Sequence, residues 1–164
     1  MPHRDRASRN LIGRAVALGL FAALAACQAS TSNAVELERS AAGLEQVVLT
    51  IHSARGEHRF TVEVAGTPEE QAYGLMNRSE LAPDKGMIFP FDPPRDASFW
   101  MKNTLIPLDM IFIRADGTIA NIAENTVPMS LEPVMSEGPV KAVLEIAGGR
   151  SAELGIKAGD KVAW

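Results

Sequence analysis

The sequence is poor in cysteine: Cys27 is the only one among 164 residues, so no disulfide can form within the chain. Its main apolar run, residues 15–26, is too short to cross a bilayer, which takes about 20 residues. The chain contains no Gly-x-Ser-x-Gly nucleophile motif, no glycine-rich phosphate loop and no internal repeat. These absences exclude a disulfide framework and give no direct sign of nucleophilic or phosphate chemistry.

The N-terminal segment has the pattern of a secretory signal. Four arginines, at positions 4, 6, 9 and 14, lead into the apolar run, and Leu24-Ala25-Ala26 precedes Cys27. This junction resembles a bacterial lipoprotein signal. We therefore expect removal of residues 1–26, acylation of Cys27 and export to the periplasm. Because Gln28 rather than aspartate follows the cysteine, the usual enterobacterial sorting pattern indicates the outer membrane. The alternative is an unmodified thiol beside an ordinary cleavable signal.

The charge balance of the chain is acidic. It has 16 basic and 20 acidic residues, a net charge of −4. Removal of residues 1–26 takes away four arginines and one aspartate, which leaves 12 basic and 19 acidic residues and a net charge of −7. An acidic chain without a basic cluster argues against nucleic acid as a partner and against electrostatic docking to anionic lipid. Membrane attachment is therefore expected through acyl chains at Cys27, where several chains hold far more stably than one.

The rest of the chain predicts a tether and one domain. Residues 27–43 are mostly small and polar, without an apolar period, which is typical of a flexible tether. A single β-rich domain should occupy residues 44–164. Alternating or continuous apolar runs predict strands over 47–52, 60–64, 87–89, 97–101, 108–113, 118–123, 140–146 and 161–164. The run over 108–113 is nearly all apolar, so we expect this strand to be covered on both faces.

Helix and turn signals complete the expected fold. Thr67 and Pro68 begin a helix predicted over 68–78, and a second helical turn is expected over 151–154. The buried face of the first helix should consist of Ala72, Leu75 and Met76. Asp116-Gly117 fits a type I′ hairpin turn. The predicted fold class is mainly β: a small barrel or sandwich of short, mostly antiparallel strands with one or two short helices.

The segment 99–109 is the richest in possible functional side chains. Strand alternation places Trp100 and Lys102 on one face, side by side. An indole next to an ammonium group offers a surface for an anionic or sugar-like ligand. The alternative is that Trp100 belongs to the core and Lys102 extends past it to solvent.

Asp109 is a carboxylate at the start of an apolar run. It lies between Leu108 and Met110, where an ionised group needs a cation or backbone N–H donors. The partners we expect are Lys102, Arg78 or the turn at Asn103-Thr104. Three roles stay open for Asp109: stabilising the fold, contacting a ligand together with Lys102 and Trp100, or general acid–base catalysis.

Four motifs in this domain resemble those of the domain of unknown function 192 family. They are Gly74-Leu75-Met76-Asn77-Arg78, Gly86-Met87-Ile88-Phe89-Pro90-Phe91, the segment from Phe99 to Asp109, and Leu144-Glu145-Ile146-Ala147-Gly148. The resemblance covers roughly residues 60–162. It implies a compact β-rich domain that is often exported, and it supplies no catalytic residues. It selects the ligand-binding candidates Arg78, Trp100, Lys102, Asn103 and Asp109.

Metal sites receive little support from the sequence. His52 and His58 flank the first turn, but a zinc site needs a third ligand at suitable spacing. Methionine thioethers suit Cu(I), yet they also fill β-sheet cores. The methionines concerned are Met76, Met87, Met101, Met110, Met129 and Met135. We expect no bound metal and no cofactor.

The favoured function is a non-catalytic cell-envelope lipoprotein module that binds a small ligand or a partner protein. One alternative is an envelope enzyme that uses Lys102 and Asp109 on a glycan-like substrate. The other is a periplasmic Cu(I)-binding protein.

Overall fold

The computed structural model describes residues 38–164. The predicted signal peptide over residues 1–26, the acylated Cys27 and the tether up to residue 37 lie outside the described residues and stay predictions. Residues 40–44 form a turn in which the Ser40 N–H donates to the Leu44 carbonyl oxygen at 2.9 Å. No helix in the described part is long and apolar enough to cross a membrane.

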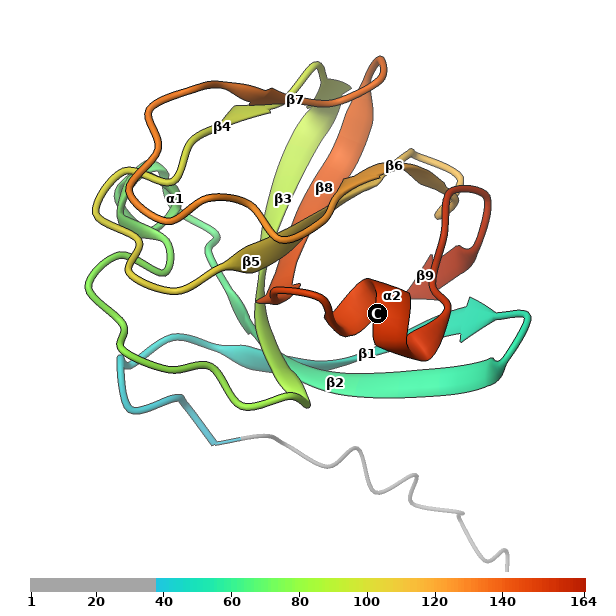
Figure 1. Ribbon diagram of the computed structural model, residues 1–164, viewed down its shortest axis with the longest axis horizontal. Coiled ribbons are helices and arrows are strands. Elements are labelled where there is room, and N and C mark those ends of the chain that lie inside the picture. The colour runs from blue at the N-terminus through green and yellow to red at the C-terminus, as the bar shows by residue number, and fades with distance from the viewer. Residues whose placement is uncertain (1–37) are drawn as a thin grey trace, which may run out of the picture. The chain divides into compact units, whose positions relative to one another are not determined.

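Seven strands form one sheet in the order β6-β5-β8-β3-β2-β1-β9 (Figure 1). Neighbouring strands run antiparallel, except that β2 and β3 are parallel. A second sheet contains only β4 (Ser98–Phe99) and β7 (Val134–Met135). The strands of the large sheet are β1 (Gln46–Ser53), β2 (Gly56–Val64), β3 (Lys85–Arg95), β5 (Leu108–Ile113), β6 (Ile119–Ala123), β8 (Val140–Ala147) and β9 (Lys161–Ala163).

The large sheet curls until its two edge strands meet at one end. Thr118, directly before β6, forms a bridge with Lys161 of β9. The Val162 N–H donates to the Gly117 carbonyl oxygen at 2.8 Å beside this bridge. The result is a half-barrel of mostly antiparallel strands with two short helices, as the sequence predicts.

The sheet separates two hydrophobic clusters. Residues from all seven strands form the inner cluster inside the curl, including Ile111 and Ile113 of β5. The outer cluster lies on the other face and includes Met110 and Phe112 of β5. All six residues of β5 are buried. This confirms the predicted strand over 108–113 and its coverage on both faces.

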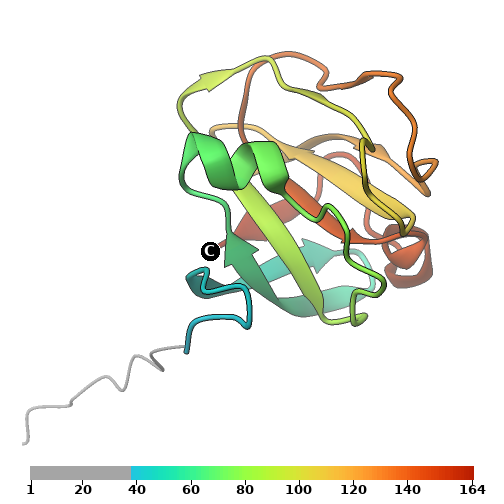
Figure 2. The same ribbon diagram turned by 90° about the vertical axis from the view of Figure 1, so that its left-hand side faces the viewer.

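The first helix, α1 (Pro68–Tyr73), is shorter than predicted. Its start is as expected: the Thr67 side chain accepts from the Glu70 N–H in a capping box. It ends early because the chain turns at Gly74, which has φ 50°. Its predicted buried face is wrong in part, since Ala72 is exposed while Leu75, beyond the helix, is buried. Figure 2 shows α1 beside β3. Gln71 ties the two elements together by donating to the Pro90 carbonyl oxygen at 2.9 Å.

Other local differences have simple backbone causes. Only Gly117 of the Asp116-Gly117 pair has positive φ, at 82°, so the predicted type I′ turn, which needs two such residues, is wrong. β3 continues past Pro90, because Pro90 and the residues after it lie in an irregular stretch of pairing with β8. The second helix, α2 (Arg150–Leu154), lies where the helical turn was predicted.

Candidate functional site

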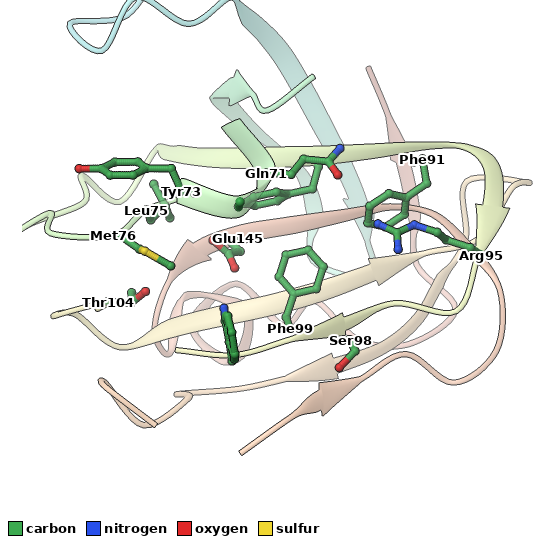
Figure 3. Close-up of a pocket in the computed structure, with 14 residues that line it drawn as sticks. Gln71, Tyr73, Leu75, Met76, Phe91, Arg95, Ser98, Phe99, Thr104 and Glu145 are labelled. Atoms are coloured by element: carbon green, nitrogen blue, oxygen red, sulfur yellow. The ribbon is translucent and has the colours of Figure 1, made fainter. Parts of the chain in front are cut away.

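A pocket of about 280 Å³ opens on the outer-cluster face of the sheet. We call it the Glu145 pocket. Its walls come from α1 and the loop after it, from β3, from β4 with the residue that follows, and from β8 (Figure 3). The residues that line it are Gln71, Ala72, Tyr73, Gly74, Leu75, Met76, Phe89, Phe91, Arg95, Ser98, Phe99, Trp100, Thr104 and Glu145.

Glu145 is a carboxyl group on β8, an inner strand of the sheet that lies between β5 and β3. It pairs with Met87 of β3 and Met110 of β5, and it is only 4% exposed. Burial raises the pKa of the Glu145 carboxyl to about 8, and no hydrogen bond or charge contributes to the shift. The group is therefore mostly protonated at pH 7. In Figure 3 it points into the space bordered by Met76, Phe99 and Thr104.

Aromatic rings form much of the pocket wall. Phe99 packs edge to face against Phe89, with ring centres 5.1 Å apart, and lies 6.5 Å from Phe91. Trp100 and Tyr73, which also line the pocket, are 52% and 56% exposed. The Glu145 pocket thus combines an apolar, aromatic wall with one buried carboxyl group, an arrangement suited to a small molecule with a single polar anchor.

Two protein cations already lie on rings of this wall. The Arg95 guanidinium is 4.2 Å from the centre of the Phe91 ring, and the Lys102 ammonium is 5.2 Å from the Trp100 ring. Trp100 and Lys102 are thus neighbours, but strand alternation is not the reason: β4 ends at Phe99, so the strand predicted over 97–101 is wrong in its extent, and Lys102 lies in a turn. Trp100 belongs to the pocket and to the surface rather than to the core.

Asp109 has a different environment, in which backbone groups surround it. The carboxylate is fully buried. Its Oδ1 accepts from the N–H groups of Asn125 and Gly149, each at 2.8 Å, and its Oδ2 accepts from the Ser151 N–H at 2.7 Å. α2 has no side-chain cap of its own, so Asp109 of β5 caps it from a neighbouring element. Backbone pairing was one of the expected solutions, but the named partners Lys102, Arg78 and the Asn103-Thr104 turn were wrong.

Arg78 and Asn103 lie outside the lining of the Glu145 pocket. The Arg78 guanidinium forms an ion pair with Glu63 of β2. Asn103 has φ 55°, and its carbonyl oxygen accepts from the Asn77 N–H at 2.8 Å. Both residues connect the loop after α1 to other segments. Of the five sequence candidates, only Trp100 lines the pocket, with Lys102 beside it.

The histidines and methionines are distributed over separate contacts. His52 lies 3.3 Å from Glu57, whereas His58 lies 2.9 Å from the Ser53 hydroxyl. Within residues 38–164, no group of three His, Cys, Asp or Glu side chains is placed to hold a metal ion. Met87, Met101 and Met110 are buried in the outer cluster, and Met76 lines the Glu145 pocket.

Sequence reasoning did not select Glu145, although a signal was present. Glu145 lies within the apolar run from Val140 to Ile146, just as Asp109 lies near the start of the apolar run from Leu108 to Ile113. A carboxylate inside a strand that is otherwise apolar predicts a buried acid in both cases. Phe89 and Phe99 both lie more than 40 residues before Glu145 in the chain, so no local pattern signals that their rings line the same pocket.

Comparison with known proteins places the domain in a family. The model of the DUF192 family, described as an uncharacterized ACR, matches residues 50–164. A crystal structure of a protein of unknown function from Novosphingobium aromaticivorans DSM 12444 is 49% identical, with a TM-score of 0.77, over 80% of this chain and 94% of that one. The crystal structure of a "putative transcription regulator" from Sinorhizobium meliloti 1021 is 43% identical, with a TM-score of 0.71. The match covers 73% of this chain and 94% of that one. No curated protein matches. The chain therefore belongs to the DUF192 family.

Proposed function

We propose that this protein is a non-catalytic cell-envelope lipoprotein that binds a small amphipathic molecule in the Glu145 pocket. Its N-terminal arginines, apolar run and Cys27 support export and acylation. In this proposal, acyl chains on Cys27 hold the protein at a membrane, and the outer membrane is the expected one. The domain then samples small molecules in the periplasm.

The observation that carries the proposal is the Glu145 carboxyl group, which is only 4% exposed, lines the pocket and has no hydrogen-bond or ion-pair partner among residues 38–164. Burial removes most of the water from this carboxyl group, yet the group lines the pocket and is therefore reachable by a ligand. Its neighbours across the strands, Met87 and Met110, are apolar and carry no charge that could pair with it. A ligand that hydrogen-bonds to Glu145 would recover the free energy that burial costs.

The size of the pocket limits the ligand. Its volume of about 280 Å³ is near the lower end of small-molecule sites, which span roughly 300–1,000 Å³. The exposed rings of Tyr73 and Trp100 leave the mouth accessible. We therefore expect a compact ligand with an apolar body rather than a polymer chain.

The alternative functions receive less support. An enzyme based on Lys102 and Asp109 would need an accessible carboxylate, whereas Asp109 is buried and holds three backbone N–H groups. Cu(I) binding keeps one favourable feature, because Met76 and Trp100 both line the Glu145 pocket. Copper titration under reducing conditions tests that alternative. Transcription regulation, the role named for the Sinorhizobium relative, receives no support from the acidic balance of the chain, which argues against a nucleic-acid partner.

Proton–nitrogen NMR during a fragment screen tests the proposal. The two tryptophan indole N–H signals give an internal comparison, since Trp100 lines the pocket and Trp164 does not. Fragments that bind in the pocket should shift the Trp100 signal saturably and leave the Trp164 signal in place. A screen whose hits move only Trp164, or residues outside the pocket, would contradict the proposal.

A further inference from the structure

We infer that the ligand of the Glu145 pocket carries a cationic nitrogen, an ammonium group on a small apolar or aromatic body, which Glu145 and the surrounding rings bind together. This inference rests on the proposed function and specifies the chemistry of its ligand.

The first argument is that these rings accept cations. The face of an aromatic ring carries partial negative charge and attracts ammonium and guanidinium groups within about 6 Å. The protein's own side chains show this at two rings of the pocket: Arg95 lies over Phe91, and Lys102 lies near Trp100. Among the described residues no protein cation lies over Phe99 or Tyr73. The Tyr73 ring is 56% exposed and remains open to a cation from a ligand, and Phe99 lines the same pocket while packing against Phe89, Phe91 and Phe112.

The second argument is the charge that surrounds Glu145. Its register neighbours, Met87 of β3 and Met110 of β5, carry no charge. Among the residues that line the pocket, the other titratable or charged groups are the Tyr73 phenol from α1 and the Arg95 guanidinium from the end of β3. Arg95 already rests on Phe91. Glu145 is thus the only carboxyl group of the lining, and an ammonium group is the partner that satisfies it.

Binding of an ammonium ion has a defined proton balance. The free pocket holds Glu145 mainly protonated near pH 7, because burial raises the pKa of its carboxyl group to about 8. In the complex, Glu145 is a carboxylate paired with the ammonium ion. The carboxyl proton therefore goes to solvent, and the ligand keeps its own proton. Affinity should rise from pH 6 to pH 8, because less work is then needed to remove this proton.

Three probes of similar shape test the inference by calorimetry: 2-phenylethylammonium, 2-phenylethanol and 3-phenylpropionate. The full-length protein in detergent should bind the ammonium probe at least about tenfold more tightly than the alcohol, as expected for a charge-assisted contact. Titrations at pH 7 in buffers of different ionisation enthalpy should show close to one proton released per ammonium ion bound. The propionate should bind most weakly of the three.

Variants assign the effect to Glu145. Glu145→Gln keeps the shape of the protonated acid and should lose both the tenfold preference and the proton release. Glu153→Gln is the matched control, since Glu153 is exposed, pairs with Arg150 and does not line the pocket. If Glu145→Gln does not fold, proton release by the unmodified protein and its pH dependence still decide the question.

The outcomes separate the two claims. Equal or tighter binding of the alcohol or the propionate overturns the cationic ligand and leaves the proposed pocket in place. A preference for ammonium that survives Glu145→Gln, or that comes without proton release, overturns the role of Glu145. Absence of saturable binding by all three probes, with no ligand in the fragment screen, counts against the proposed function itself.

Discussion

Asp109 and Glu145 are buried carboxyl groups on neighbouring strands, and they lie on opposite faces of the same sheet. Asp109 pairs across the strands with Ile146, the residue after Glu145. Ile146 belongs to the inner cluster, whereas the cross-strand neighbours of Glu145 belong to the outer cluster. Asp109 accepts from three backbone N–H groups, whereas Glu145 faces the pocket and has no hydrogen-bond partner in the part of the chain that the structure describes. One carboxyl group therefore stabilises the fold, and the other is available for binding.

Asp109→Ala should strongly destabilise the domain. The change leaves three buried N–H donors, those of Asn125, Gly149 and Ser151, without their acceptor. We expect a loss on the order of 3 kcal/mol or more in the free energy of unfolding. Asp109→Asn should lose less stability, because the side-chain oxygen of asparagine can still accept from Asn125 and Gly149. Its NH₂ group would face the Ser151 N–H, which then has no acceptor. Urea denaturation measures both variants, and an unchanged midpoint for Asp109→Ala would refute the capping role.

Glu145→Gln should change how stability depends on pH. The pKa of Glu145 is about 8 in the folded protein and about 4.5 as its ordinary value. Between these values the folded state binds a proton that the unfolded state has lost, so stability falls as pH rises from about 5 to 8. Glutamine removes this dependence. The variant should match the parent protein near pH 4.5 and be more stable at pH 9, by a few kcal/mol. Parallel melting curves across this pH range would contradict the buried, unpaired state of Glu145.

Trp100 should report on the pocket by fluorescence. Trp100 and Trp164 are the two tryptophans of the chain, so Trp164→Phe leaves Trp100 as the single emitter. Since Trp100 is 52% exposed, we expect red-shifted emission and ready quenching by acrylamide. A pocket ligand should reduce the quenching. Blue-shifted emission that acrylamide does not quench would show that Trp100 is buried and would remove it from the candidate site.

Gly86→Ala should disrupt the contact between β3 and β8. A Cβ atom at this position would lie 2.5 Å from the Glu145 carbonyl oxygen, and this backbone atom cannot move without shifting the strand. Overpacking of this kind costs about 1–3 kcal/mol. Gly66→Ala is the control, because the nearest atom to its Cβ is the end of the Glu70 side chain at 3.8 Å. Similar melting temperatures for the two variants would argue against the close approach of β3 and β8.

Cys27 should be the acylated residue. It is the only cysteine, and it follows Leu24-Ala25-Ala26 at the end of the apolar run. Metabolic labelling with a radioactive fatty acid should mark the parent protein and leave Cys27→Ala unlabelled. Equal labelling of the two proteins would reject acylation at this position.

Local patterns in the sequence determined the fold class and most strands of the large sheet. The run over 108–113 is a strand buried on both faces. Five of its six residues are apolar, and the sixth, Asp109, is hydrogen-bonded, so neither face needs solvent. The N-terminus of α1 followed from Thr67 and Pro68 for the same local reason. The end of α1 did not follow from the sequence, because the helical spacing of apolar residues continues beyond Gly74. The backbone of Gly74 has positive φ and lies close to the Phe89 ring, and this ends the helix.

Only the tertiary structure decided which polar groups have partners. The N–H groups that surround Asp109 come from positions 16, 40 and 42 residues away, so no local pattern could predict them. The sequence marks Glu145 as an acid in an apolar run in the same way. Whether such an acid is satisfied depends on which distant segments fold over it. The turns at Gly149 and Asn125 reach Asp109, whereas α1, β3 and β4 bring aromatic rings and open space to Glu145.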